Sequence, residues 1–90
     1  MLIVSYDISD NKLRTRFSKF LSKYGYRLQY SVFNIQNSKR IIDLITFEIE
    51  NKFAKKFEES DSVLIYTVSE NTITKYGYAR HEDQDLLIII

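Results

Sequence analysis

The stretch MLIVSYDI, residues 1–8, determines how the rest of this chain is interpreted. Its apolar residues are mostly β-branched or aromatic, and the run has the length of a β-strand. It ends in a carboxylate, Asp7. The later candidate strands end in Asn34, in Ser69 or at the last residue, so Asp7 is the first candidate for a catalytic or metal-binding side chain.

The composition limits the class of protein. The 90 residues form one small domain, residues 1–90, and 44% hydrophobic residues are enough for a core. The chain has no cysteine, which excludes disulfides and thiolate metal sites, and we expect a cytoplasmic protein. We expect neither a signal peptide nor membrane association, because the first residues lack a basic leader and no apolar stretch reaches the length of a membrane span.

Positive charges are concentrated in one part of the chain, although the formal net charge is only +1. Residues 11–42 contain no Asp or Glu, whereas the remainder is acidic. The basic residues of this segment are Lys12, Arg14, Arg16, Lys19, Lys23, Arg27, Lys39 and Arg40. Such asymmetry indicates a surface that faces a polyanion. An ordinary solvated helix face is the alternative.

A first amphipathic helix is predicted directly after the opening strand. Ser9 or Asp10 can cap its N-terminus, and Gly25 is expected to stop it after about Tyr24. The apolar residues at helical spacing that form its buried stripe are Leu13, Phe17, Phe20, Leu21 and Tyr24. The residues on an adjoining face are Lys12, Arg16, Lys19 and Lys23. One face is therefore expected in the core and its neighbour on a basic surface.

A second helix is predicted to begin after Asn37 or Ser38 and to extend to about Glu59. Its buried stripe consists of Ile42, Ile45, Ile49, Phe53 and Phe57. Leu44 and Phe47 lie off this stripe, either as contacts with a partner or as ordinary surface residues.

Three further stretches are predicted to be extended. Residues 26–36, YRLQYSVFNIQ, alternate like one bent strand or two short ones. Residues 62–68, SVLIYTV, and 72–78, TITKYGY, are joined by Ser-Glu-Asn, which suits a hairpin. Residues 79–85 form a polar loop, and residues 86–90, LLIII, are expected to pair within a dimer or with another protein.

This order of elements predicts the fold class. Two amphipathic helices interleaved with strands indicate an α+β sandwich, in which both helices cover one face of an antiparallel sheet. The natural candidate is the ferredoxin-like arrangement with an extra C-terminal strand. The fold alone does not determine a function.

Several short motifs in the first part of the chain resemble a known family. They are Tyr6-Asp7-Ile8 at the end of the first strand, Arg14 and Arg16 on the following helix, and Gln29-Tyr30-Ser31-Val32-Phe33 in the next extended stretch. At this spacing they resemble the CRISPR-associated Cas2 family, small proteins that act with the Cas integrase in spacer acquisition. Asn34 departs from the pattern, because an acid is frequent there.

The resemblance implies a homodimer with a two-fold axis near the ends of the first strands. It implies binding of nucleic acid, namely the DNA protospacer and in some members RNA, and bridging of two dimers of the CRISPR-associated integrase. It also implies Mg²⁺-dependent endonuclease activity in some members. The metal falls on Asp7, and catalytic roles fall on Asp7, Arg14 and Arg16. With the basic helix face included, the residues expected to bind nucleic acid are Tyr6, Lys12, Arg14, Arg16, Lys19, Arg27 and Phe33.

A single aspartate is a poor ligand set for Mg²⁺, which takes six oxygens and usually keeps several waters beside one or two carboxylates. A two-fold axis can add the Asp7 of a partner, so that two protomers share one ion that activates a water. Arginine then suits the phosphate better than lysine, because its planar fork binds two oxygens. The simpler alternatives are that Asp7 accepts backbone N–H groups at its turn, and that Phe33 belongs to the core.

Different functions therefore remain open. One is a Mg²⁺-dependent endonuclease at paired Asp7 residues, and another is a non-catalytic DNA bridge with sequence-tolerant, salt-dependent binding. A third is a stand-alone toxin ribonuclease of the VapD type, although the QYSVF stretch favours the CRISPR family. An RNA-recognition module is disfavoured because its strand motif is missing. With only two glycines, the chain has no glycine-rich phosphate loop.

Overall fold

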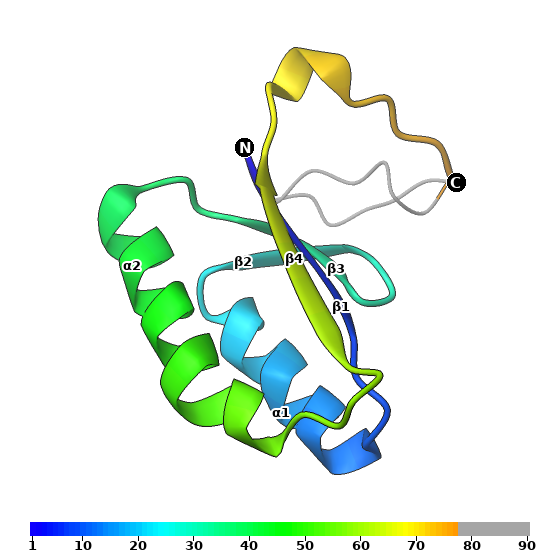
Figure 1. Ribbon diagram of the computed structural model, residues 1–90. Coiled ribbons are helices and arrows are strands. Elements are labelled where there is room, and N and C mark those ends of the chain that lie inside the picture. Colours follow the sequence, from blue (N-terminus) through cyan, green and yellow to red (C-terminus); the bar gives the residue numbers. More distant parts are fainter. Residues whose placement is uncertain (78–90) are drawn as a thin grey trace.

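A computed structural model describes residues 1–77 of the chain, and for Glu70 only the backbone. Its antiparallel sheet has the strand order β2-β3-β1-β4, with β1 in the interior (Figure 1). The strands are β1 (Leu2–Asp7), β2 (Gly25–Gln29), β3 (Val32–Ile35) and β4 (Ser62–Thr67). The predicted α+β, ferredoxin-like class is confirmed, and the opening stretch of the sequence is an interior strand.

Both helices pack on the same face of the sheet (Figure 1). They are α1 (Asn11–Ser22) and α2 (Lys39–Glu48), and α2 continues through a π-helical turn, η1 (Ile49–Phe53), and a 3₁₀ turn, η2 (Ala54–Lys56). Alternate residues of β1 lie in one buried cluster with Phe17 of α1 and Ile45 of α2. No helix within residues 1–77 has the length and apolar character needed to cross a membrane.

Phe17 lies at the centre of the core and is fully buried. Its ring centroid lies 4.9 Å from that of Tyr6 in β1 and 5.0 Å from that of Phe53 in η1, both in edge-to-face geometry. Such pairs contribute on the order of 1 kcal/mol beyond their burial. One side chain of α1 therefore connects the central strand to the end of the second helical segment.

The predicted apolar stripe of the second helix is largely confirmed. Ile45 and Phe53 are buried, and Ile42, Ile49 and Phe57 pack against the core. Ile41 is also buried, which the predicted stripe omitted. The off-stripe residues Leu44 and Phe47 are 36% and 62% exposed, and a partner at this position stays a prediction.

The N-termini of both helices agree with the prediction, but the C-terminus of α1 does not. The Asp10 carboxylate accepts a hydrogen bond from the Leu13 N–H at 2.8 Å, and Ser38 caps α2 in the same way. The helix was predicted to run to about Tyr24 and to be stopped by Gly25, but α1 ends at Ser22 with Lys23 as its C-cap. Gly25 has no positive φ and begins β2. A Cβ at Gly25 would lie 2.0 Å from the Asn34 carbonyl oxygen, so glycine is needed there for close contact with β3.

Residues 26–36 form two short strands rather than one bent strand. β2 and β3 are joined by a tight turn at Tyr30 and Ser31, and Ser31 has a φ of 68°. The pairing is irregular between Arg27 and Gln29, as in a β-bulge. This hairpin carries two of the predicted site residues, Arg27 and Phe33.

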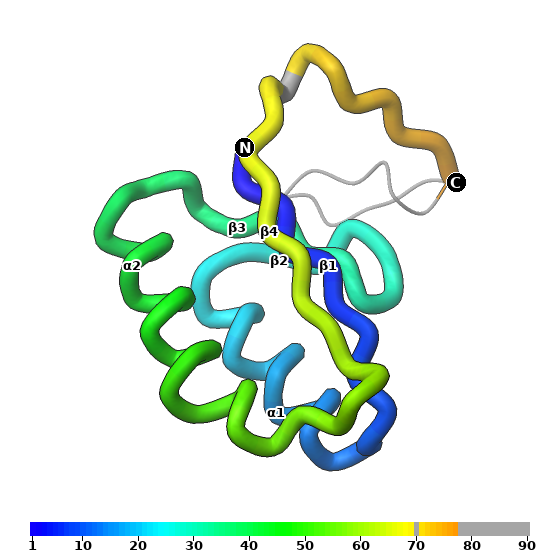
Figure 2. Tube along the Cα trace, in the orientation of Figure 1, coloured from blue at the N-terminus to red at the C-terminus, as the bar shows by residue number. Residues whose placement is uncertain are grey.

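The hairpin predicted after α2 was wrong in its second strand. After β4, the chain forms a 3₁₀ turn, η3 (Glu70–Thr72), and residues 73–76 have no regular structure. Both the N–H and the hydroxyl of Thr72 donate to the Ser69 carbonyl, at 3.0 and 2.7 Å, and this local turn replaces a strand ladder. Figure 2 shows the N-terminus beside the end of β4, where Met1 bonds to Val68. The predicted loop at 79–85 and strand at 86–90 lie outside the described residues.

Candidate metal and nucleic-acid site

Asp7 is the last residue of β1, and its side chain is exposed. It lies opposite Ser62, the first residue of β4. Within residues 1–77 the Asp7 carboxylate makes no hydrogen bond or ion pair. The alternative role of Asp7 as an acceptor of backbone N–H groups is therefore not found, and Asp10 and Asp61 fill that role instead.

Asp61 holds the turn that follows Asp7. Its carboxylate accepts hydrogen bonds from the Ser9 N–H at 2.9 Å, from the Ser9 hydroxyl at 3.0 Å and from the Glu58 N–H at 2.9 Å. The Ser9 hydroxyl also lies 3.2 Å from a Glu58 carboxylate oxygen. These contacts connect the β1–α1 turn to the loop before β4. Sequence reasoning missed Asp61, because an acid in a polar loop shows no sign of a partner 52 residues away.

Changing Asp61 to asparagine is expected to remove a pH-dependent part of the stability. The N–H groups of Glu58 and Ser9 lower the pKa of the Asp61 carboxyl below its ordinary value of 3.8. A carboxyl with a lowered folded-state pKa stabilises the fold above the ordinary pKa, and this contribution is lost as the pH falls through the lowered pKa. Urea unfolding at several pH values should show a wild-type advantage at pH 7 that disappears in acid. A difference between Asp61→Asn and the wild type that stays constant with pH would contradict the prediction.

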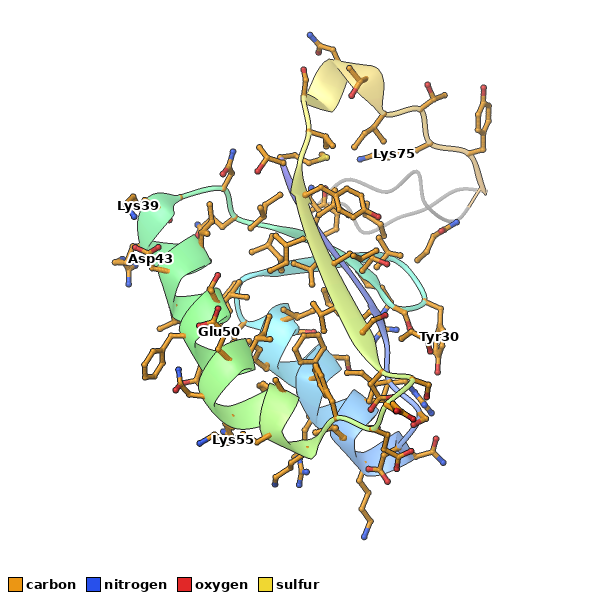
Figure 3. The ribbon with its side chains drawn as sticks, in the orientation of Figure 1. Tyr30, Lys39, Asp43, Glu50, Lys55 and Lys75 are labelled. Atoms are coloured by element: carbon orange, nitrogen blue, oxygen red, sulfur yellow. The ribbon has the colours of Figure 1, made fainter. Side chains whose placement is uncertain are left out.

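Arg14 lies against the same turn, whereas the other basic residues of α1 point outward. An Arg14 guanidinium N–H donates to the Ile8 carbonyl at 2.9 Å, and the other terminal nitrogen bonds to the Asn11 side chain. Lys12, Arg16 and Lys19 are exposed on α1. The ion pair found within residues 1–77 is Lys39–Asp43 at 3.0 Å, so these cations have no acidic partner there (Figure 3). The structure therefore brings Arg14, but not Arg16, into contact with the turn after Asp7.

Tyr6 and Phe33, two further residues predicted to bind nucleic acid, are buried, with exposed fractions of 5% and 1%. Their rings are stacked with centroids 6.3 Å apart, and the Arg27 guanidinium lies 5.1 Å from the Phe33 centroid. Burial raises the pKa of the Tyr6 phenol above its ordinary value, while Arg27 and a hydrogen bond with Ser31 act in the opposite direction. Phe33 lies against the half-buried Arg27, and the rings of Tyr6 and Phe33 are not on the surface.

The donor set for a metal is small. Residues 1–77 contain no group of three or more acidic or imidazole side chains that can hold an ion. Among residues 1–77, the carboxylate at this turn without a hydrogen bond or ion pair is that of Asp7. Mg²⁺ is commonly held by one or two carboxylates together with waters and substrate phosphates. Asp7 alone gives the smaller of these donor sets, and the Asp7 of a second protomer would give the larger one.

The fold and the site together define a class: small ferredoxin-like proteins with a basic first helix and an exposed carboxylate at the end of the central strand. The family model described as "CRISPR associated protein Cas2" matches residues 1–76. The chain belongs to this family. Membership favours the CRISPR-associated interpretation over the stand-alone toxin of the VapD type.

Relatives and a solved structure agree with this assignment. The chain is 33% identical over 76 residues to "CRISPR-associated endoribonuclease Cas2 3" of Synechocystis sp., covering 83% of this chain and 78% of that protein. It is 30% identical over 90 residues to "CRISPR-associated endoribonuclease Cas2 2" of Methanospirillum hungatei JF-1, covering 97% of each. The crystal structure of Streptococcus pyogenes Cas2 has the same fold, with a TM-score of 0.66 and 22% identity over 84% of this chain and 98% of that one.

Proposed function

We propose that this chain acts in CRISPR adaptation as a nucleic-acid-binding homodimer that bridges two dimers of the CRISPR-associated integrase and carries the DNA protospacer. The observation that carries this proposal is a row of exposed cations on α1, at Lys12, Arg16 and Lys19, which have no acidic partner among residues 1–77. Exposed cations without acidic partners are free to neutralise phosphates. Membership of the Cas2 family supports the CRISPR-associated role.

Contacts of this kind bind the backbone of a nucleic acid and do not read its sequence. Each neutralised phosphate releases counterions, so that affinity falls steeply as salt rises. Sequence-tolerant binding suits a protein that must accept many different DNA fragments. Arg14 is half-buried and bonded to backbone carbonyls, so its first role is to hold the turn beside Asp7.

The homodimer is also proposed to cleave phosphodiester bonds in a Mg²⁺-dependent reaction, with RNA as the first substrate to test because the relatives are named endoribonucleases. The exposed Asp7 carboxylate, which has no partner among residues 1–77, supports this part of the proposal. The two Asp7 side chains of the dimer would hold the ion. Bound Mg²⁺ supplies Lewis-acid polarisation of a phosphate oxygen and lowers the pKa of a coordinated water. Arg16 neutralises the phosphate, and Arg14 keeps the turn after Asp7 in place.

A triple variant of the basic helix tests the binding function. Lys12→Ala/Arg16→Ala/Lys19→Ala should weaken binding to duplex DNA by about tenfold or more at low salt. The slope of log Kd against log salt concentration should fall by up to about 3 for each protomer that contacts the DNA, since each lost phosphate contact accounts for roughly 0.9. The measurements are a fluorescence-anisotropy salt series and a spacer-acquisition assay, in which the triple variant should fail.

The chain offers a matched control for the charge change. Lys52→Ala/Lys55→Ala/Lys56→Ala removes the same number of positive charges from exposed positions on η1 and η2. Figure 3 labels one of them, Lys55. Binding should stay close to that of the wild type. Equal weakening by the two triple variants would show that net charge alone matters and would reject α1 as the binding surface.

A further inference from the structure

We propose that Tyr30 and Arg27, at the tip of the β2–β3 hairpin, form a stacking site for one unpaired base of a single-stranded nucleic acid. The inference rests on the proposed function and extends it from phosphate contacts to the base. The resemblance to the Cas2 family placed no role on Tyr30. Tyr30 would supply the aromatic face, and Arg27 would supply the positive charge beside it.

Tyr30 is presented to solvent by a well-held turn. Its side chain is 71% exposed, and Figure 3 shows it at the outer end of the hairpin, pointing away from the body of the fold. The next residue, Ser31, has a positive φ of 68°, and its carbonyl accepts a hydrogen bond from the Tyr6 N–H at 3.1 Å. This hydrogen bond joins the turn to the central strand β1, so the backbone that carries the Tyr30 ring is held in place.

Arg27 distinguishes this ring from the other exposed rings. The guanidinium of Arg27 lies 6.0 Å from the Tyr30 centroid and 5.1 Å from that of the buried Phe33. Phe33 cannot move without disturbing the core, so it fixes the position of the cation. Within residues 1–77, no cation lies in this way over the exposed rings of Phe47, Tyr66 or Tyr76.

An exposed aromatic ring beside a fixed cation matches the chemistry of single-stranded nucleic acid. A base stacks on the ring whatever its identity, and the cation attracts the phosphate next to it. A base inside a duplex is already stacked on both sides and does not reach such a ring. The turn bonds to Tyr6, directly before Asp7, so a strand held at Tyr30 lies at the same end of β1 as the unpaired carboxylate.

The test compares binding of oligonucleotides that differ only in whether they carry free bases. Fluorescence anisotropy in EDTA would measure the Kd of labelled oligouridine and oligothymidine of about 12 nucleotides, an abasic oligonucleotide of equal length, and a duplex of equal length. The proteins are the wild type, Tyr30→Ala, Tyr30→Phe and the control Tyr76→Ala, a tyrosine that is 79% exposed. Gel filtration would check that all four have the same oligomeric state.

Tyr30→Ala should weaken binding of both single strands about tenfold, as expected for the loss of one base stack, and should leave abasic and duplex binding unchanged. Tyr30→Phe should retain wild-type affinity, because it keeps the ring. Equal losses on all four ligands, or equal losses in Tyr30→Ala and Tyr76→Ala, would overturn the stacking site alone. If the wild type binds none of the four ligands at low salt, the proposed binding function fails, and the stacking site fails with it.

Discussion

Asp7→Asn should abolish Mg²⁺-dependent RNA cleavage while leaving the affinity for nucleic acid unchanged. Asparagine keeps the shape of the side chain but removes the negative charge that holds the ion. Because both protomers carry the change, the proposed dimer loses both carboxylates at once. Metal ions contribute several kcal/mol to the stabilisation of such transition states, which corresponds to at least about a hundredfold in rate.

Cleavage of labelled RNA and duplex DNA by extensively purified protein, with Mg²⁺ and with EDTA, measures this effect. Asp43→Asn is the matched control, because Asp43 is an exposed aspartate that pairs with Lys39 on α2 (Figure 3). Activity that survives in Asp7→Asn would remove Asp7 from the chemistry. If neither protein cleaves, while both bind DNA and both support spacer acquisition, the non-catalytic bridge is the better account.

Gly25→Ala should lower the free energy of unfolding by about 3 kcal/mol or more. The added Cβ would lie 2.0 Å from the Asn34 carbonyl oxygen and 2.8 Å from the Ile35 Cα, and both of these are backbone atoms of the paired strand. No flexible side chain can move aside, so β2 and β3 must separate locally. Urea denaturation measures the loss.

Gln29→Ala is the control for this change, because Gln29 is an exposed residue at the other end of β2. Its effect should stay within about 0.5 kcal/mol, as for most surface substitutions. A Gly25→Ala protein with wild-type stability would mean that the two strands can separate at this end without cost. Close contact with β3 would then no longer explain why a glycine occupies this position.

The elements that the sequence predicted well have local or periodic signals. The opening strand shows its apolar run, and Asp10 and Ser38 stand just before the helices that they cap. Gly25 was misassigned because a glycine after a helix suits either a left-handed cap or a close approach between strands. The choice depends on Asn34, which lies in another strand. A local pattern therefore could not decide between the two.

Residues 72–78 show the opposite limit: their β-branched and aromatic residues predicted a strand, and none forms in the described part, residues 72–77. A strand forms only where another strand pairs with it, and here a local turn between Ser69 and Thr72 forms instead.

The candidate site was likewise predictable where its signal is local and not where it depends on distant residues. The sequence located Asp7 at the end of the central strand, but the bonds of Asp61 to Ser9 join distant parts of the chain. The burial of Phe33 likewise depends on the packing of the whole core.

The π-helical turn η1 has a consequence for the length of the chain. Its i→i+5 bonding, seen where the Ala54 N–H bonds to the Ile49 carbonyl, accommodates one residue more than an α-helical turn. The segment is equivalent to an α-helix with one inserted residue, and the π-helical turn accommodates that residue locally. Phe53 still reaches the ring of Phe17, so the insertion does not displace the side chains that follow. Loss of one codon within this turn is therefore expected to restore a regular α-helix while the same residues still form the core.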